Sequence, residues 1–297
     1  MKRGGCFPVG GGNAIVNALV DIIEQNGGEL RTRFDVDKVL VEKGRAVGVS
    51  GTNGEALYSD VVIINIGIKD TVSRLLRPHQ LPKAYREKML QYAVSKSNLC
   101  LFVGLEGDIT EVEAEPLNYR IYRRELFDEV GDPCLPDWEP NVATVMFQSL
   151  RDKNKRDGKY HTCEILIPTP YDYFSNWAKQ KVKKRDKAYK EMKETVSKKM
   201  LKVLTDRFPG IDEYVKYWEL GTPVTYEYYC RHQNGATMGM QNTPGKFHDV
   251  DIRLASPLKN LFYAGADVFS CGIMGSFMSG IAAASLVTGK NLFTRLR

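Results

Sequence analysis

The order of apolar and polar positions predicts short helices and strands in the first quarter of the chain. Apolar residues recur at helical spacing over residues 13–26, so we expect an amphipathic helix with Asn13 as its N-cap and Gly27 and Gly28 as its stop. Strand-like runs follow at 29–33, 36–42, 46–49, 55–59 and 61–65, with turns at 43–44 and 53–54.

The run at 61–65 differs from the other strands because its first four residues are all apolar. A strand of this kind is usually buried on both faces, as in the parallel sheet of an α/β domain. Ligands of such sheets lie at the carboxyl ends of the strands, and this strand ends at Gly67. A ligand is therefore expected near Gly67.

The middle of the chain, from about 77 to 251, differs from the first quarter in its predicted elements and in its aromatic content. It predicts strands over 94–105, 143–149 and 163–167, and a mainly helical stretch over 171–207. Aromatic residues are dense here. Core packing explains any one of them, and as a group they would also suit a long apolar ligand.

The C-terminal end returns to an α/β pattern. Residues 261–267 predict a buried strand, residues 268–272 a loop, and residues 273–287 a helix rich in small side chains. Small side chains let a helix lie close to a sheet or to a ligand. The chain as a whole is therefore expected to be an α/β protein with an α+β insert.

Composition indicates a protein that is neither secreted nor membrane-spanning. The six cysteines are scattered, with no C-x-x-C pair, which is typical of reduced thiols. No stretch approaches the ~18 consecutive apolar residues of a spanning helix, and no signal-peptide pattern is present. The sequence therefore predicts a cytoplasmic location.

The positive charge is concentrated in one segment. The chain has a formal net charge of +6, yet residues 179–202 contain eleven basic and three acidic residues, so the remainder is slightly acidic. A solvated helix face is one interpretation. Peripheral contact with an anionic membrane is another, where each basic residue contributes about 1 kcal/mol. No nucleic-acid reader motif accompanies the segment, so no nucleic-acid partner is predicted.

Several catalytic signatures are absent from the sequence. It has no G-x-x-x-x-G-K-[ST], H-E-x-x-H or G-x-S-x-G pattern, and its four histidines show no metal spacing, so no metal site is predicted. Residues 10–15 resemble a dinucleotide fingerprint but fail it, because Ile15 stands where the third glycine is required. A hydrolase or a metalloenzyme therefore has little support.

The strongest local feature is the C-terminal strand, glycine loop and helix. The strand end would bring Asp267 to a ribose-like or ribityl-like hydroxyl group. The amides from Gly272 to Gly275 would meet negative charge, such as the N1/C2=O edge of a reduced flavin. A tightly packed strand and helix without a ligand explains the same pattern, and both interpretations remain open at this point.

A series of segments spread through the chain carries a family resemblance: residues 8–12, 27–31, 36–41, 46–49, 61–65, 167–177, 221–229 and 260–273. In this order they resemble the phytoene desaturase and carotenoid isomerase family of FAD-dependent oxidoreductases, and within it the retinol saturase branch. The resemblance implies an incomplete, Rossmann-like FAD-binding domain at 1–76 and 252–297. It implies a mixed-sheet substrate domain with helices at 77–251.

The resemblance also assigns cofactor-binding positions. One position pairs its backbone with the adenine, two border the dinucleotide after a strand, two contact FAD after the last strand, and four cover the flavin ring. In that order these are Val36; Asn65 and Gly67; Gly265 and Asp267; and Gly272, Ile273, Met274 and Gly275.

The activity implied by the resemblance is oxidation or reduction of carbon–carbon double bonds in an apolar polyene. Reduction of such a bond needs hydride from flavin N5 at one carbon and a proton at its neighbour. NAD(P) is expected as an electron source. No catalytic residue is assigned, although Tyr228, Tyr229 and Cys271 could donate a proton by their chemistry.

One departure from the family pattern concerns the pyrophosphate. Family members have a strand, a G-x-G-x-x-G turn and a helix that bind it, and this sequence has none of these. We therefore expect the C-terminal part of a longer or split protein, partnered by a separate N-terminal FAD-binding chain. The alternatives are a non-catalytic lipid-binding protein of related fold, and a truncated product without activity of its own.

Overall fold

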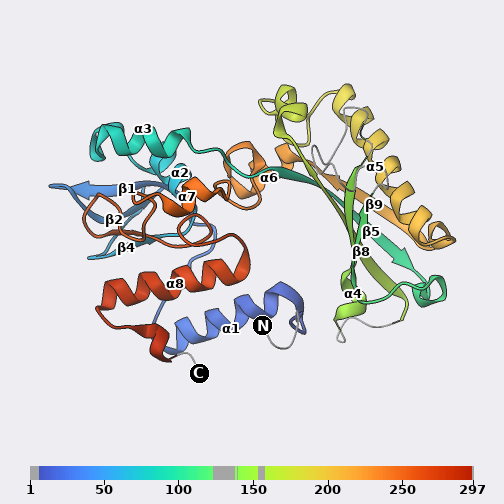
Figure 1. The fold of residues 1–297 in the computed structure, drawn as a ribbon, viewed down its shortest axis with the longest axis horizontal. Helices are drawn as coiled ribbons and strands as arrows, with labels where there is room; N and C mark the ends of the chain where they lie inside the picture. The colour runs from blue at the N-terminus through green and yellow to red at the C-terminus, as the bar shows by residue number, and fades with distance from the viewer. Residues whose placement is uncertain (1–6, 123–137, 139, 153–157, 296–297) are drawn as a thin grey trace. The chain divides into compact units, whose positions relative to one another are not determined.

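The computed structural model describes residues 7–122, 138, 140–152 and 158–295 (Figure 1). They form two compact units, one within 1–30 and 97–229 and the other within 31–96 and 230–297. The predicted mixed α/β class is confirmed. The unit boundaries differ from the predicted 76/77 and 251/252, because Met89 and Met240 lie in the core of the second unit.

Two sheets form the second unit. An antiparallel sheet contains β1 (Val36–Glu42), β2 (Arg45–Gly51) and β3 (Ala56–Tyr58), and β4 (Val62–Ile64) pairs in parallel with β10 (Leu261–Tyr263). These strands confirm the predictions from residue 36 onward.

The predicted strand at 29–33 is wrong. Arg33 has a φ of 58°, which breaks an extended strand. The Arg31 guanidinium instead donates to Glu55 Oε1 at 2.7 Å.

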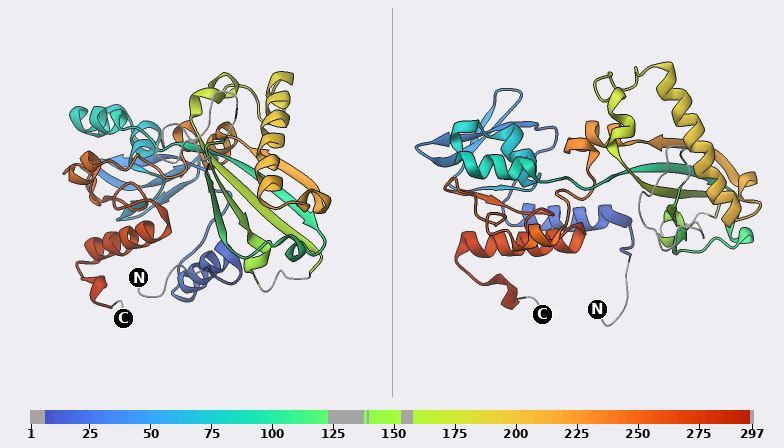
Figure 2. Two further views of the ribbon diagram at one scale, coloured as in Figure 1. Left: turned by 45° about the vertical axis from the view of Figure 1, so that its right-hand side comes forward. Right: turned by 45° about the horizontal axis from the view of Figure 1, so that its top comes forward.

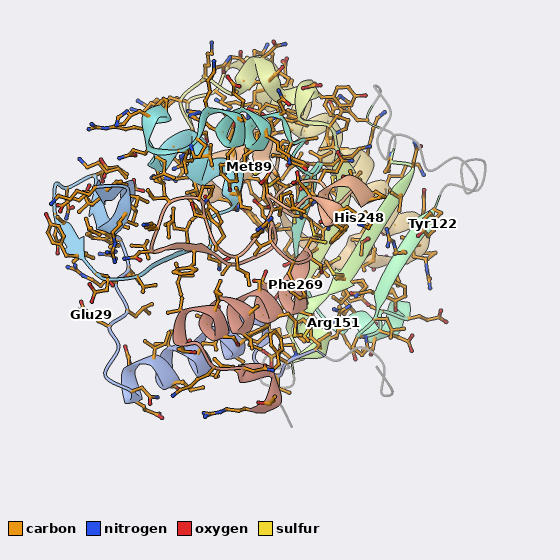
Figure 3. The ribbon with its side chains drawn as sticks, turned by 60° about the vertical axis from the view of Figure 1, so that its left-hand side comes forward. Glu29, Met89, Tyr122, Arg151, His248 and Phe269 are labelled. Carbon is orange, nitrogen blue, oxygen red and sulfur yellow. The ribbon has the colours of Figure 1, made fainter. Side chains whose placement is uncertain are left out.

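Helices pack around the strands of the second unit. Both Figure 1 and Figure 2 show α3 (Lys83–Gln91) and α8 (Gly272–Thr288) on opposite sides of β1, β2 and β4. Met89, labelled in Figure 3, is fully buried on α3. The shorter helical segments are α2 (Ile68–Asp70), Thr71–Leu75, Pro78–Gln80, Gln233–Gly235, α7 (Pro244–His248) and Leu292–Arg295.

A five-stranded sheet forms the first unit, in the order β6 (Asn118–Tyr122), β7 (Val142–Phe147), β8 (Tyr160–Thr169), β5 (Ser97–Glu106) and β9 (Val215–Gly221). Every described pairing is antiparallel, so the predicted mixed sheet is corrected. Alternate residues of β5, from Leu99 to Leu105, lie in one core with α5 (Lys187–Arg207). The predicted helical stretch 171–207 is interrupted before α5, because the Asp186 carboxylate caps it by accepting from Tyr189 N at 2.9 Å.

The remaining helices of the first unit are mostly short, and α1 (Gly11–Gln25) is the exception. It begins at Gly11 rather than after Asn13, because Gly10 takes the left-handed N-cap conformation. None of its residues is buried, although its apolar face is the one predicted. The other segments are Ile109–Val112, α4 (Gln148–Arg151), Tyr171–Trp177, Ile211–Tyr214 and α6 (Pro223–Cys230).

Candidate cofactor site

Two parallel strands of the second unit end side by side. Ile64 of β4 lies opposite Tyr263 of β10, so the residues that follow them share one edge of the sheet. A Cβ atom on Gly265 would lie only 2.0 Å from Asn65 Oδ1, and Gly265 has a φ of +96°. The Gly265 N–H donates to Ser279 Oγ of α8 at 2.6 Å. Only glycine fits at 265, and two of the predicted cofactor residues are brought together here.

Asp267 connects three loops at this edge. It is 3% exposed; its Oδ2 accepts from Ile68 N at 2.8 Å and its Oδ1 accepts from Met240 N at 2.7 Å. The carboxylate also approaches Gly67, where a Cβ atom would lie 2.9 Å from Oδ2. Because each carboxylate oxygen has two lone pairs, contact with a cofactor hydroxyl stays a prediction, while the backbone contacts give Asp267 a structural role.

A buried lysine that the sequence analysis missed lies behind Asp267. Lys246 is 2% exposed, and its Nζ donates to Asn242 Oδ1 at 2.8 Å and to the Ala266 carbonyl at 3.3 Å. Burial lowers the pKa of Lys246, and the Asp267 carboxylate opposes that change. No local pattern signals such a residue, because its burial depends on loops distant in the sequence.

A histidine also belongs to this edge, although the sequence analysis assigned it no role. His232 Nδ1 lies 3.0 Å from Asp70 Oδ2. The hydrogen bond to Asp70 raises the pKa of His232, and the Asp267 carboxylate acts in the same direction. The two partners are 162 residues apart in the chain, so only the fold shows that they meet.

The start of α8 presents free backbone amides and apolar side chains. Its N-cap residue, Cys271, makes no side-chain capping bond, and the first turn contains no acidic residue. Ile273 and Met274 are 62% and 59% exposed. The preceding loop, in which Figure 3 labels Phe269, lies so close that a Cβ atom on Gly275 would fall 1.9 Å from the Ser270 carbonyl oxygen. The positive end of the helix dipole is thus available to an electron-rich ligand.

These features fit one part of an FAD molecule. The α8 amides and the exposed apolar pair at 273 and 274 suit a flat, electron-rich ring, and Gly67 and Gly265 allow a ligand to approach the backbone closely. Val36 lies at the start of β1, opposite Gly51 and half-buried. The sequence has no G-x-G-x-x-G turn for the pyrophosphate. The described residues therefore offer groups for the ring of the cofactor.

The sheet of the first unit has a face that carries both apolar and acidic residues. Leu101 of β5 and Ile165 of β8 face the α5 core. The residues before and after each of them along its strand therefore point to the opposite face. There Phe102 is 46% exposed and pairs with Glu164 of β8 and Glu219 of β9, while Cys100 pairs with Leu166. A long apolar ligand could lie against this face.

Two kinds of feature are absent from the described residues. No helix among them is long and apolar enough to cross a bilayer. Within the same residues, no group of three or more His, Cys, Asp or Glu side chains could hold a metal ion.

Comparison with known proteins places this arrangement in context. The model of the family described as flavin containing amine oxidoreductase matches residues 1–288. The chain is 28% identical to all-trans-retinol 13,14-reductase of Rattus norvegicus, a match that covers 99% of the chain and 51% of the relative. It is 25% identical to prolycopene isomerase of Daucus carota, covering 95% and 44%. It is also 25% identical to a Danio rerio protein named inactive all-trans-retinol 13,14-reductase, covering 98% and 50%. The chain thus spans about half the length of the curated relatives it matches.

The fold is also similar to those of solved oxidoreductase structures. An oxidoreductase from Methanosarcina mazei aligns over 95% of this chain and 55% of its own, with a TM-score of 0.56 and 16% identity. Putrescine oxidase bound to putrescine aligns over 94% and 53%, with a TM-score of 0.60 and 12% identity.

Proposed function

The chain belongs to the family of flavin containing amine oxidoreductases, and from this premise we propose that it forms the C-terminal part of an FAD-dependent oxidoreductase acting on an apolar polyene. The observation that carries the proposal is the edge formed by Asn65, Gly265, Asp267 and the start of α8. The names of the relatives, a retinol reductase and a carotenoid isomerase, support a polyene as the substrate class.

Each part of the chain would have a distinct task in that reaction. Bound FAD supplies the chemistry, which is hydride transfer through its N5 atom. The free amides of α8 would stabilise negative charge on the ring, and Ile273 and Met274 would pack on it. The apolar side chains of Phe102 and Leu166 would contact the polyene. NAD(P) as the electron source stays a prediction.

The open sheet of the second unit supports a separate FAD-binding partner. The parallel sheet of the described residues contains only β4 and β10, fewer strands than a stable sheet needs. Ile63, at the centre of β4, is 47% exposed, so the prediction of burial on both faces is wrong for this strand. We propose that a partner strand, followed by a G-x-G-x-x-G turn, pairs with β4. Its carboxyl end would then lie beside Asn65, where the cofactor is expected.

Coexpression tests this proposal. A partner polypeptide carrying the strand, the G-x-G-x-x-G turn and the helix is expected to copurify with the chain, and the complex is expected to show the visible absorption of oxidised flavin. Ile63→Lys should abolish both results, because it places a charge in the sheet that the partner would bury. Tyr58→Lys is the matched control, since Tyr58 is 73% exposed on the edge strand β3. A folded complex without flavin would contradict the proposed function.

A non-catalytic lipid-binding protein is the second candidate. It is favoured by the match to a relative named inactive. Retinoid binding by the isolated chain, without flavin in any complex, would support this candidate over the enzyme.

We also propose peripheral contact with anionic membranes through residues 179–202. The structure reduces the charge available for this contact: Arg185 is buried, and lysines 187, 193, 198 and 202 pair with carboxylates. Cosedimentation with anionic liposomes is expected, and several Lys→Glu changes in the segment should weaken it. Unchanged cosedimentation after those changes would reject the contact.

A further inference from the structure

A pocket of about 450 Å³ lies in the first unit, where the edge strand β9 meets β5 and the first turns of α5. Its volume is within the range of roughly 300–1,000 Å³ of small-molecule sites. The pocket lies at the edge of the sheet and shares Phe102 with the proposed polyene face. The charged residues in its lining are not explained by a neutral polyene.

The walls of the pocket are mainly apolar. Phe102, Leu220 and Tyr229 line it, and Tyr229 is 64% exposed. Apolar walls of this kind gain free energy when a hydrocarbon replaces the water against them. A ligand with an apolar body would therefore bind here.

The floor of the pocket contains a buried positive charge without a negative partner. Arg185 is 8% exposed and lines both this pocket and a second one of about 410 Å³. Its hydrogen-bond acceptors are neutral: the Trp177 carbonyl at 3.3 Å, the Val224 carbonyl at 3.3 Å and the Tyr189 hydroxyl at 3.5 Å. No ion pair of Arg185 occurs within the described part of the chain.

A buried charge is costly unless an opposite charge or good hydrogen bonds compensate for it. The three hydrogen bonds of Arg185 are long, and its guanidinium carbon lies 4.9 Å from the centre of the Tyr189 ring. A guanidinium has five N–H donors, so part of its donor capacity remains unused. A carboxylate is the group whose geometry best matches those donors. The pocket thus has a position for a negatively charged head group.

Further positive charge lines the pocket. Lys183, Lys190 and Lys193 contribute to the lining, and Glu219, the one acidic residue there, pairs with Lys193. Lys183 and Lys190 make no ion pair with any described residue. The charge around the pocket therefore favours an anion over a neutral ligand.

We propose that this pocket, the Arg185 pocket, binds an anionic amphiphile, with its carboxylate at Arg185, Lys183 and Lys190 and its hydrocarbon chain against Phe102, Leu220 and Tyr229. This site shares Phe102 with the proposed polyene face, and it is inferred independently of that face and of the flavin site. The head group is the feature that distinguishes its ligand from a neutral polyene.

Oleate below its micelle concentration is the probe, and oleyl alcohol, with the same chain and no charge, is the control ligand. Equilibrium dialysis against the full chain is expected to show oleate bound at least about tenfold more tightly than the alcohol. Equal binding of the two would overturn the proposal. Binding of oleate only when it is part of a vesicle would also overturn it, because that result indicates a bilayer surface rather than a pocket.

Two sets of variants test the assigned residues. The double change Lys183→Glu with Lys190→Glu should weaken oleate binding by about tenfold or more, whereas Lys187→Glu with Lys198→Glu, an equal change of charge outside the pocket, should alter it less than about twofold. Equal losses in both double variants would contradict the site.

Arg185→Met separates binding from structure. Replacing an unpaired buried charge by an apolar group should leave the thermal midpoint of the free chain unchanged or raised, while oleate binding is lost. A lowered midpoint together with intact oleate binding would show that Arg185 has only a structural role, and would overturn its part in the proposal.

Discussion

Gly275→Ala is expected to destabilise the second unit by about 3 kcal/mol and to prevent flavin binding by the assembled protein. A Cβ atom at this position would lie 1.9 Å from the Ser270 carbonyl oxygen and 2.6 Å from its carbonyl carbon. Both are backbone atoms, so no side-chain rotation relieves the clash. The loop that contains Asp267 or the start of α8 must move instead. Urea denaturation measures the loss of stability. The visible absorption of flavin in the complex shows whether the moved loop or helix still allows the cofactor to bind.

Gly280→Ala is the matched control in the same helix. A Cβ atom at Gly280 meets nothing within 4 Å, and the residue is exposed. Alanine lowers the backbone entropy that the helix loses on folding. The free energy of unfolding of this variant should therefore rise by up to about 1 kcal/mol, and flavin binding should be kept. If both variants behaved alike, the close contact between the loop and α8 would not be what positions this site.

Asp267→Ala is expected to cost about 4 kcal/mol, because it leaves two buried backbone N–H groups without an acceptor. The carboxylate accepts from Ile68 and Met240, and its charge opposes the lowering of the pKa of Lys246 by burial. Its removal leaves Lys246 with uncharged acceptors only, the Asn242 amide and the Ala266 carbonyl. The free energy of unfolding in urea is the measurement.

Asp60→Ala is the control for Asp267→Ala. Asp60 is exposed and precedes β4, and its replacement should change the free energy of unfolding by no more than about 0.5 kcal/mol. A stability loss in Asp267→Ala as small as this would mean that the aspartate does not connect the loops. Its role would then be confined to contact with the cofactor.

Both substitutions disturb the same edge of the parallel sheet. Glycines at 67, 239 and 265 leave room for the Asp267 carboxylate and the Asn65 side chain, since a Cβ atom at each would fall within 3 Å of them. The edge of the parallel sheet is therefore built by backbone and carboxylate contacts before any ligand is added. Such a preformed edge reduces the conformational entropy that the loops of the protein would lose on binding a cofactor.

Local pattern predicted the elements whose stability depends on their own sequence. The apolar spacing of 13–26 and 273–287 identified two helices, and alternation with turn residues identified β1, β2 and β3. The predictions failed where distant contacts decide. The run at 29–33 is held by Arg31 and its partner Glu55, and the stretch at 171–207 is divided by the Asp186 cap.

For this protein, the sequence by itself determined the α/β class, the family resemblance and the positions of the glycine loops, because periodicity and backbone freedom are properties of neighbouring residues. Only the tertiary structure decided which polar groups are buried and with what. Asp267 meets Ile68 across 199 residues, His232 meets Asp70 across 162, and Arg185 lies buried without a carboxylate. The cost of desolvating a charge depends on every element packed around it, and no local pattern records that environment.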